Sequence, residues 1–391
     1  MKSNQLIASL FIVLIFTLSC EKKTQLKTPV KQFDLDLFEQ NIKDAMDNNT
    51  IGYAYSISNN GTQIRSGSWG NAVADFDAVN EGPKPHGETR RQDIASVSKV
   101  ITALACLNLM EQEGVKEGSI IGTYLPYHWT YNSNLDTRNF LNIMSHQAGI
   151  PTTGGIFHNS IKALAEADTN YTTGPFNYSN SNYAILRILI AYMWDKPTLR
   201  AIESDIVTGG KTENDLADAI SHQYIEAVNH YVFDPIGIPY TEPKPVSGKD
   251  KVWNYRFGFS SGGWVIGDAT AFVGSAGWRL SAKELNNIIA NAKYNNNYLS
   301  ESQRSLMEKY LMGWDPGASM NVEGGMSYGH GGFHNEDFWT TGTSLSRGCL
   351  SAVIQFPNNY EVAAVTNAIG GMTNNMETTL INAYNNAWVI K

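Results

Sequence analysis

The sequence predicts an α/β protein of the α+β type, in which helices flank both faces of an antiparallel sheet and a largely helical domain is inserted between its strands. Hairpin patterns lie near both ends of the chain, and an almost wholly apolar helix follows the first of them. Between them, residues 116–270 contain helical segments and no clear strand alternation. The 391 residues, 42% of them apolar, are enough to bury such a core.

The first twenty residues have the pattern of a signal peptide. A lysine at the second position provides the positive end, and the apolar run of residues 6–19 is too short to span a bilayer. The run ends at Cys20 after a small residue, which resembles a bacterial lipoprotein cleavage site, although Thr17 stands where a Leu is usual. We therefore expect residues 1–20 to direct export, and a lipid on Cys20 to anchor the protein to a membrane of the bacterial cell envelope. Residues 21–32 are polar and aperiodic, as a tether should be, and ordinary signal cleavage beside an incidental cysteine is the alternative.

The sheet domain is expected at residues 33–115 and 271–391, and the mainly helical domain at residues 116–270. Strand alternation and turn residues predict two hairpins, which should pair within one sheet. They join residues 51–57 to 62–69 and residues 350–356 to 360–366. Helical periodicity and capping signals predict the helices. These are residues 96–113, 138–145, 183–194, 216–232, 281–292 and 376–389.

Composition excludes two classes of function. The formal net charge is −8 and no Lys/Arg run exceeds a pair, so nothing indicates a nucleic-acid partner. No Cys/His or His-Glu-x-x-His spacing indicates a metal site, and no cofactor is expected. Besides Cys20 the chain has only Cys106 and Cys349, which is too few for a disulfide scaffold, although a single bridge between them stays open.

The first element with catalytic potential is Ser96-Val97-Ser98-Lys99, at the start of the apolar helix. Positions i and i+3 share a helix face, so the Ser96 hydroxyl and the Lys99 amine can meet. A serine hydroxyl is a weak nucleophile until a base takes its proton. A lysine can be that base if burial and nearby positive charge hold it neutral. The alternative, a surface pair on an ordinary helix, is disfavoured by the apolar residues that follow.

The second element is Tyr178-Ser179-Asn180. A phenol near a cationic lysine can have a lowered pKa and relay protons, and we expect this of Tyr178. The Asn180 amide can hydrogen-bond both the acyl group of a substrate and Lys99. Taken alone, this tripeptide is equally typical of an ordinary loop.

The third element is His330-Gly331-Gly332. Its glycines allow a substrate backbone to lie close against a strand edge. Taken alone, it is equally typical of a glycine loop around a hydrogen-bonded histidine.

Together, in this order, the three elements resemble the serine β-lactamase and penicillin-binding family, in the branch of class C β-lactamases, serine DD-peptidases and related esterases. The segments that carry the resemblance are residues 93–99, 141–151, 176–183, 275–285 and 328–332. The resemblance implies that Ser96 attacks a carbonyl to form an acyl-enzyme and that Lys99 and Tyr178 share the acid and base work. It also implies an oxyanion hole of the backbone N–H groups of Ser96 and Phe333. Substrate would contact Asn180, His330, Gly331, Gly332 and Phe333.

Two departures from the family bear on the substrate. Gly331 and Phe333 stand where β-lactamases and DD-peptidases usually carry hydroxyls that bind a substrate carboxylate, and His330 supplies less certain charge than the usual Lys. We therefore expect a small-molecule or peptide acyl substrate, an ester or an amide, that lacks this carboxylate. A β-lactamase or D-alanyl-D-alanine carboxypeptidase stays an alternative, because Arg347 can restore carboxylate binding. A further alternative is a non-hydrolytic penicillin-binding or sensor protein, which would acylate but fail to deacylate.

Overall fold

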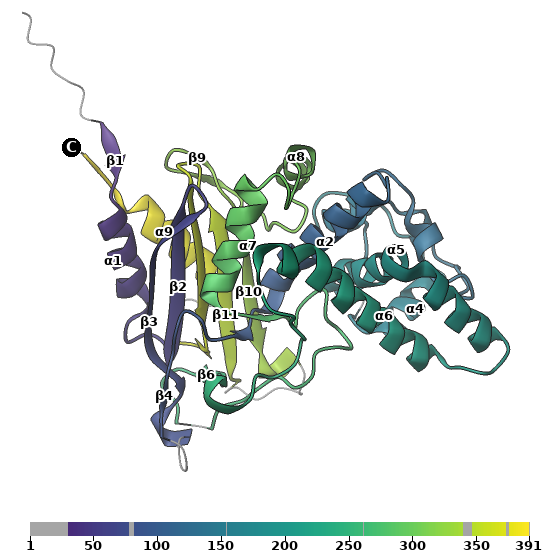
Figure 1. Ribbon diagram of the computed structural model, residues 1–391, viewed down its shortest axis with the longest axis horizontal. Helices are drawn as coiled ribbons and strands as arrows, with labels where there is room; N and C mark the ends of the chain where they lie inside the picture. Colours follow the sequence, from purple (N-terminus) through teal and green to yellow (C-terminus); the bar gives the residue numbers. More distant parts are fainter. Residues whose placement is uncertain are drawn as a thin grey trace, which may run out of the picture.

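The structure is a computed structural model that describes residues 30–77, 82–153, 155–260, 262–338, 346–372 and 375–390. The expected signal segment with Cys20, and all but the last residues of the expected tether, lie outside these ranges. Within them, no helix is long and apolar enough to cross a membrane. The sheet stands beside a group of helices from the middle of the chain (Figure 1). The parts of the chain before and after these helices both contribute strands to the sheet.

Eight strands of the described chain form the main sheet, in the order β13-β6-β11-β12-β2-β3-β4, with β10 also paired to β11. They are β2 (Gly52–Asn59), β3 (Thr62–Val73), β4 (Lys84–Pro85), β6 (Tyr255–Arg256), β10 (Tyr328–Asn335), β11 (Gly348–Gln355), β12 (Tyr360–Thr366) and β13 (Ala368–Ile369). The predicted pairing of the two hairpins is confirmed, because β12 runs antiparallel to β2 with Ala363 opposite Ser56. One departure from the expected antiparallel sheet is the parallel pair of β13 and β6. Strand β6 comes from the segment expected to be helical, so the chain returns to the sheet before residue 271.

Three short two-stranded ladders accompany the main sheet. They are β1 (Lys31–Phe33) with β14 (Trp388–Ile390), β5 (Gln92–Asp93) with β7 (Arg279–Leu280), and β8 (Asn321–Val322) with β9 (Gly325–Met326). The first ladder brings the two ends of the described chain together. It also changes two expectations, since Lys31 and Gln32 belong to a strand rather than to the tether, and Trp388 belongs to a strand rather than to the last helix.

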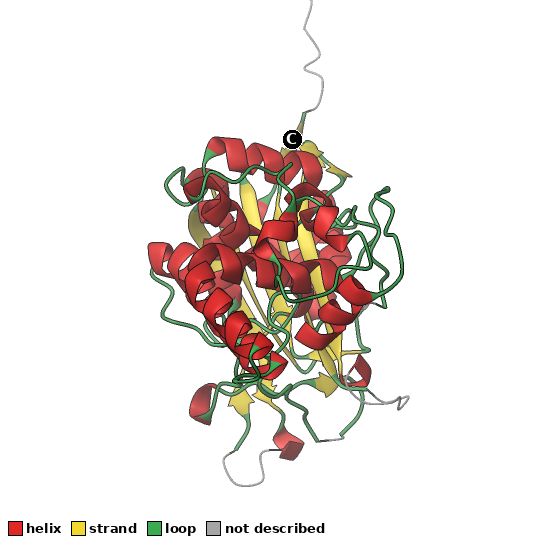
Figure 2. Cartoon of the chain, turned by 90° about the vertical axis from the view of Figure 1, so that its right-hand side faces the viewer, coloured by secondary structure: helices red, strands yellow, loops and turns green. Residues whose placement is uncertain are grey.

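Helices cover both faces of the sheet, as the sequence predicts (Figures 1 and 2). They are α1 (Leu35–Met46), α2 (Ser98–Gln112), α3 (Phe140–Met144), α4 (His158–Glu166), α5 (Asn180–Val207), α6 (Glu213–Val228), α7 (Ala282–Tyr294), α8 (Glu301–Tyr310) and α9 (Met376–Asn385). Along β2, Tyr53 and Tyr55 pack in a core with α1 and α9, whereas Ala54 faces the larger core that contains α2. This alternation follows from the two-residue period of a strand.

The ends of α5 and α9 differ from the expected ones, the first for a local reason and the second because of a distant strand. Helix α5 continues past the expected end at residue 194, and its backbone is non-helical at Asp195. There the Asp195 carboxylate accepts a hydrogen bond from the Thr198 amide at 3.2 Å, so Asp195 caps a second helical stretch with Pro197 in its first turn. Helix α9 ends at Asn385, because residues 388–390 pair with β1.

Helix α2 runs through the core between the sheet and the other helices. Its residues from Ser98 to Leu107 are all buried, which confirms the expectation of an apolar helix packed on several sides. The short 3₁₀ turn η2 (Ala95–Val97) precedes it and carries Ser96. The fold therefore holds Ser96 at the N-terminal end of a rigid central helix.

Candidate active site

Ser96 is the one accessible residue in a long buried stretch. From residue 92 to residue 107 every other side chain is buried, and Ser96 alone is partly exposed. The residue before it, Ala95, has a φ of 46°, in the left-handed region that non-glycine residues rarely adopt. The Asp93 carboxylate accepts a hydrogen bond from the Ala95 amide at 2.9 Å, which helps to hold this turn. The turn presents the Ser96 hydroxyl to solvent from a buried helix end.

Lys99 lies one turn further along, with its amine against the serine. Its Nζ donates to Ser96 Oγ at 3.1 Å and to the Ser275 carbonyl at 2.7 Å. The side chain is fully buried, and this burial lowers the pKa of Lys99 to about 7, although the Asp315 carboxylate acts in the opposite direction. A lysine with this pKa is about half neutral at pH 7, and the neutral form can accept the proton of Ser96.

Tyr178 contacts the same oxygen atom from the other side. Its hydroxyl donates to Ser96 Oγ at 2.8 Å, and Lys99 Nζ lies 4.9 Å from the centre of its ring. The expectation of a lowered pKa is wrong, because burial raises the pKa of Tyr178 and the carboxylates of Asp315 and Glu377 raise it further. The expectation assumed a cationic lysine, but burial removes much of that charge. Tyr178 is therefore a protonated phenol that donates, and Lys99 is the group that can accept.

Asn180 begins helix α5 and does not make the expected contact with Lys99. The described hydrogen bonds of the Lys99 amine go to Ser96 and Ser275. The Asn180 side-chain oxygen is buried and has no hydrogen-bond partner in the described part of the chain. An unsatisfied acceptor two residues from Tyr178 can receive an N–H group of a substrate.

The third element lies on β10, which pairs with β11 so that Gly332 is opposite Ser351. A Cβ atom on Gly332 would lie 2.5 Å from the Ile94 carbonyl oxygen and closer still to Ser351 Oγ. Only glycine therefore lets β10 approach the turn that holds Ser96 this closely. The sequence predicts that these glycines let a substrate backbone lie close to the strand. In the structure, the backbone that lies close to Gly332 is the protein's own chain at Ile94. Phe333 follows with 44% of its surface exposed.

His330 carries little charge in this setting. It is 2% exposed, and burial, together with the neighbouring Lys99, lowers its pKa to about 4 in spite of Asp315. The ring is therefore neutral at pH 7. The positive charge that the family usually places at this position is absent from this strand.

His146 is a positioning residue that sequence reasoning did not single out. Its ring stacks on that of Tyr178, with centroids 4.7 Å apart. Its Nδ1 accepts hydrogen bonds from the Ser179 amide at 3.2 Å and from Asn182 Nδ2 at 3.0 Å. The pKa of His146 is well below its usual value because the ring is buried and lies near Lys99 and His330, so the neutral ring serves as an acceptor. The segment 141–151 carried the family resemblance, but its spacing gave no role to this histidine.

A second group that can position Ser96 is the carboxylate of Asp93. The buried Asp93 carboxylate accepts from the Ala95 amide and pairs with His334 of β10. Burial opposes ionisation of Asp93, but His334 and the nearby Arg279 hold its pKa below the usual value. This carboxylate therefore ties the strained turn to the strand that lies across it. Cys349 is buried beside it, and both Cys349 and Cys106 are free thiols, so the bridge left open by the sequence is not formed.

A sequence model of the family described as Beta-lactamase matches residues 38–378. The chain belongs to the beta-lactamase family. Members of this family are generally serine hydrolases. No curated protein sequence matches the chain.

Solved structures support the fold of this beta-lactamase family member. A β-lactamase/D-alanine carboxypeptidase from Yersinia pestis is 15% identical, with a TM-score of 0.62, and the match covers 90% of this chain and 99% of that one. A D-amino acid amidase from Ochrobactrum anthropi SV3 is 14% identical, with a TM-score of 0.62 and coverage of 90% and 96%. An octameric penicillin-binding protein homologue from Pyrococcus abyssi is 17% identical, with a TM-score of 0.58 and coverage of 86% and 74%.

Arg347, the alternative carboxylate anchor, is already paired. Its guanidinium donates to both carboxylate oxygens of Glu336, from Nε at 2.8 Å and from Nη2 at 2.5 Å. Its remaining nitrogen donates to the Gly262 and Gly263 carbonyls. The expectation that Arg347 restores carboxylate binding therefore finds no support, because a substrate would have to displace this bidentate pair.

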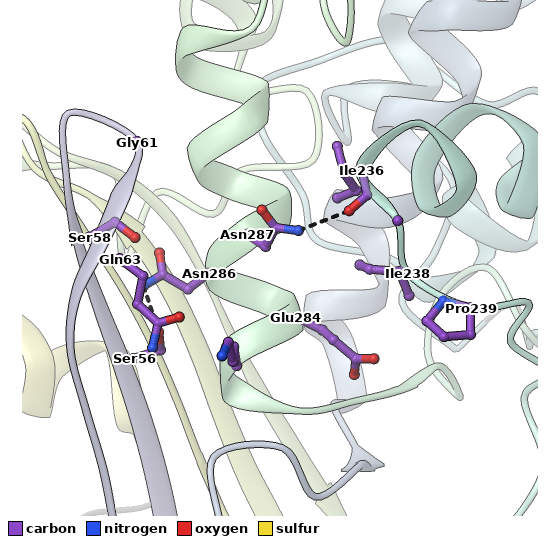
Figure 3. Close-up of a pocket in the computed structure, with 12 residues that line it drawn as sticks. Ser56, Ser58, Gly61, Gln63, Ile236, Ile238, Pro239, Glu284, Asn286 and Asn287 are labelled. Carbon is purple, nitrogen blue, oxygen red and sulfur yellow. Dashed lines mark hydrogen bonds between the residues drawn. The ribbon is translucent and has the colours of Figure 1, made fainter.

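A separate hollow of about 310 Å³ lies between the β2–β3 hairpin, helix α7 and residues 236–239 (Figure 3). At its wall, Asn286 Nδ2 donates to Ser56 Oγ at 3.0 Å and Asn287 Nδ2 donates to the Ile236 carbonyl at 3.3 Å. Its lining residues do not include Ser96, Lys99 or Tyr178, and they offer no nucleophile with a base beside it. We therefore assign this hollow no part in the chemistry at Ser96.

Proposed function

We propose that this protein is a hydrolase that forms an acyl-enzyme on Ser96 and acts on esters or amides without a free carboxylate beside the scissile bond. One observation carries the proposal: Ser96 Oγ lies 3.1 Å from Lys99 Nζ and 2.8 Å from the Tyr178 hydroxyl, in a site where Lys99 has a pKa of about 7. A nucleophile, a base of suitable pKa and a phenolic donor therefore meet at one atom.

The proposed acylation follows from these contacts. Neutral Lys99 takes the proton from Ser96 Oγ as that oxygen attacks the substrate carbonyl carbon. The backbone N–H groups of Ser96 and Phe333 stabilise the oxyanion, and the Ser96 amide is well placed because it lies in the first turn of a helix. The Tyr178 phenol then protonates the leaving group as its bond to carbon breaks, and the Lys99 ammonium returns a proton to Tyr178. Water reverses this sequence on the acyl-enzyme and releases the acid.

The carboxylate-free substrate is supported by three features of the site. His330 is neutral at pH 7, Arg347 is held by Glu336, and Gly331 has no hydroxyl. A buried carboxylate without donors loses charge-assisted hydrogen bonds worth about 1.5–3 kcal/mol each. The alternatives, a β-lactamase or D-alanyl-D-alanine carboxypeptidase, require such an anchor. Among the neighbours of similar fold, a D-amino acid amidase is named for an amide substrate, which is the second class that we propose.

The experiment is substrate profiling of the purified protein with p-nitrophenyl butyrate, an amino-acid amide, nitrocefin and a D-Ala-D-Ala peptide. Ser96→Ala is the active-site variant, and Ser98→Ala is the matched control, because Ser98 begins α2 two residues after Ser96 and its hydroxyl accepts a hydrogen bond from the Trp278 amide. We expect turnover of the ester or amide that disappears in Ser96→Ala and persists in Ser98→Ala. A stoichiometric burst without turnover on every substrate would instead indicate the non-hydrolytic sensor.

We also propose that the protein is exported and held at a bacterial membrane through a lipid on Cys20. The support is the sequence pattern of residues 1–20 and the polar segment after it. Metabolic labelling with a palmitate analogue tests this, with Cys20→Ala as the variant. Equal labelling of the two proteins, or none of either, would contradict the proposal.

A further inference from the structure

Glu377 places a carboxylate against β10, the strand that packs on the turn holding Ser96. It lies in the first turn of α9, whose N-cap is Asn375. A Cβ atom on Gly331 would lie 2.6 Å from Glu377 Oε1 and closer still to Oε2. The carboxylate therefore covers Gly331, between His330 and Gly332 of the catalytic strand. A side chain at position 331, including the usual hydroxyl, would have to displace the flexible end of the Glu377 side chain.

A second carboxylate lies beside the same strand, because the Asp315 amide donates to the Gly329 carbonyl of β10 at 2.8 Å. Burial raises the pKa of Glu377, and the negative charge of Asp315 raises it further. The same two carboxylates raise the pKa of the catalytic Tyr178, so their field reaches the nucleophile. Among the described groups that influence Glu377, none is a cation, and its stabilising contacts are helix backbone and the Asn375 side chain.

The charge around Ser96 and β10 is consequently negative. His330 is neutral at pH 7, Lys99 is only about half protonated there, and Arg347 is bound to Glu336. Asp315 is near the half-protonated Lys99, but no cation is among the described groups that influence Glu377. The two carboxylates therefore repel each other and any anion that approaches. A cationic group of a substrate would relieve both effects.

We propose that Glu377, with Asp315 nearby, is a specificity-determining residue that makes the site around Ser96 prefer substrates with a cationic group, such as an ammonium, over those with a carboxylate. The inference rests on the proposed hydrolase function and names its substrate class. The loss of a carboxylate anchor would only weaken the binding of anionic substrates. The two carboxylates add a preference for cationic substrates over neutral ones. Phe333 lies on the same face of β10 as Gly331, since side chains alternate along a strand, and it offers an apolar contact to the carbon chain of such a substrate.

The test uses two isosteric series of thioesters, because the charge can lie on either side of the scissile bond. The first comprises acetylthiocholine, 3,3-dimethylbutyl thioacetate and S-acetyl-3-mercaptopropionate, which place a cation, no charge and an anion on the leaving group. The second comprises the thiophenyl esters of 4-trimethylammoniobutyrate, 5,5-dimethylhexanoate and glutarate, which place the same charges on the acyl group. Values of kcat/KM are compared as cation-to-anion ratios, with the neutral ester correcting for any general change in rate.

We expect the wild-type ratio to favour the cation and Glu377→Gln to reduce the ratio by about tenfold to a hundredfold in at least one series. Glu301→Gln is the matched control, because Glu301 is an exposed carboxylate in the first turn of α8 and should leave the ratio within about twofold. An unchanged ratio in Glu377→Gln in both series, or a wild-type preference for the anion, overturns the inference while ester hydrolysis persists. If the neutral esters are not hydrolysed at all, the proposed function fails instead.

Discussion

The pH dependence of the reaction tests the role of Lys99 quantitatively. An exposed lysine has a pKa of 10.5, and burial lowers that of Lys99 to about 7. At pH 7 about half of the Lys99 side chains are therefore neutral, compared with about 0.03% of exposed ones, which is a gain of about three orders of magnitude in available base. The deprotonated form is the active one, so kcat/KM should rise with pH up to a plateau.

The expected profile has one acidic limb with a midpoint near pH 7. Below it, kcat/KM for p-nitrophenyl butyrate should fall about tenfold per pH unit, so that the rate at pH 5 is about a hundredth of the plateau. Asp315 raises the pKa of Lys99, so Asp315→Asn should move the midpoint to lower pH. Nitrophenol release is followed at the isosbestic wavelength of its protonated and ionised forms, which removes the pH dependence of nitrophenol absorbance.

Two results would refute this reasoning. A midpoint near pH 4 would indicate that His330 is the titrating base, because burial lowers its pKa to about 4. A rate that rises only above about pH 9 would show that Lys99 behaves as an exposed lysine and that its burial has no catalytic consequence. Lys99→Ala should lose the limb together with about a hundredfold to ten-thousandfold of the rate.

Three further predictions follow from the structure. Tyr178→Phe retains the ring that stacks on His146 but removes the donor to Ser96, so kcat should fall about a hundredfold or more while circular dichroism stays the same; near wild-type turnover would remove Tyr178 from the mechanism. The value of kcat/KM for p-nitrophenyl butyrate should exceed that for nitrocefin after correction for the intrinsic reactivity of the two substrates. Arg347→Ala should keep nitrocefin turnover within about threefold of the wild-type value, because Arg347 is paired with Glu336. A large loss in this variant would show that Arg347 binds the substrate carboxylate. In the helical region, burial opposes ionisation of Glu213, but hydrogen bonds from His158 and His128 lower its pKa to about 2. The contribution of Glu213 to stability is thus complete above pH 4.5 and is lost as the pH falls towards 2. Urea unfolding should show a lower free energy of unfolding at pH 3 than at pH 7, and this difference should be smaller in Glu213→Gln. An equal difference in both proteins would contradict the assignment.

Much of the fold could be predicted from the sequence because its signals are local. The β2–β3 and β11–β12 hairpins alternate apolar residues around Asn-containing turns, and Ser281 with Glu284 forms the predicted capping box of α7. The last helix was predicted too long, because its end depends on a strand more than 350 residues away in sequence that pairs with residues 388–390. Nothing near Trp388 in the sequence indicates that partner.

In the candidate site too, the local contacts could be predicted from the sequence and the contacts between distant segments could not. Ser96 and Lys99 could be placed together because one helical turn joins them. The raised pKa of Tyr178, the stacking of His146 and the contact of Glu377 with Gly331 depend on burial and on packing between distant segments. A sequence shows which groups can ionise, but it does not show which of them share a low-dielectric site, and that decides their charge.

The most direct test of the account is the identity of the acylated residue. The protein is mixed with p-nitrophenyl butyrate, quenched in acid within milliseconds to seconds, and analysed by intact mass and peptide mapping. The account predicts a single butyryl group on Ser96, its absence in Ser96→Ala, and its slower decay with water in Tyr178→Phe. A butyryl group on another residue, or equal acylation of wild type and Ser96→Ala, would contradict it.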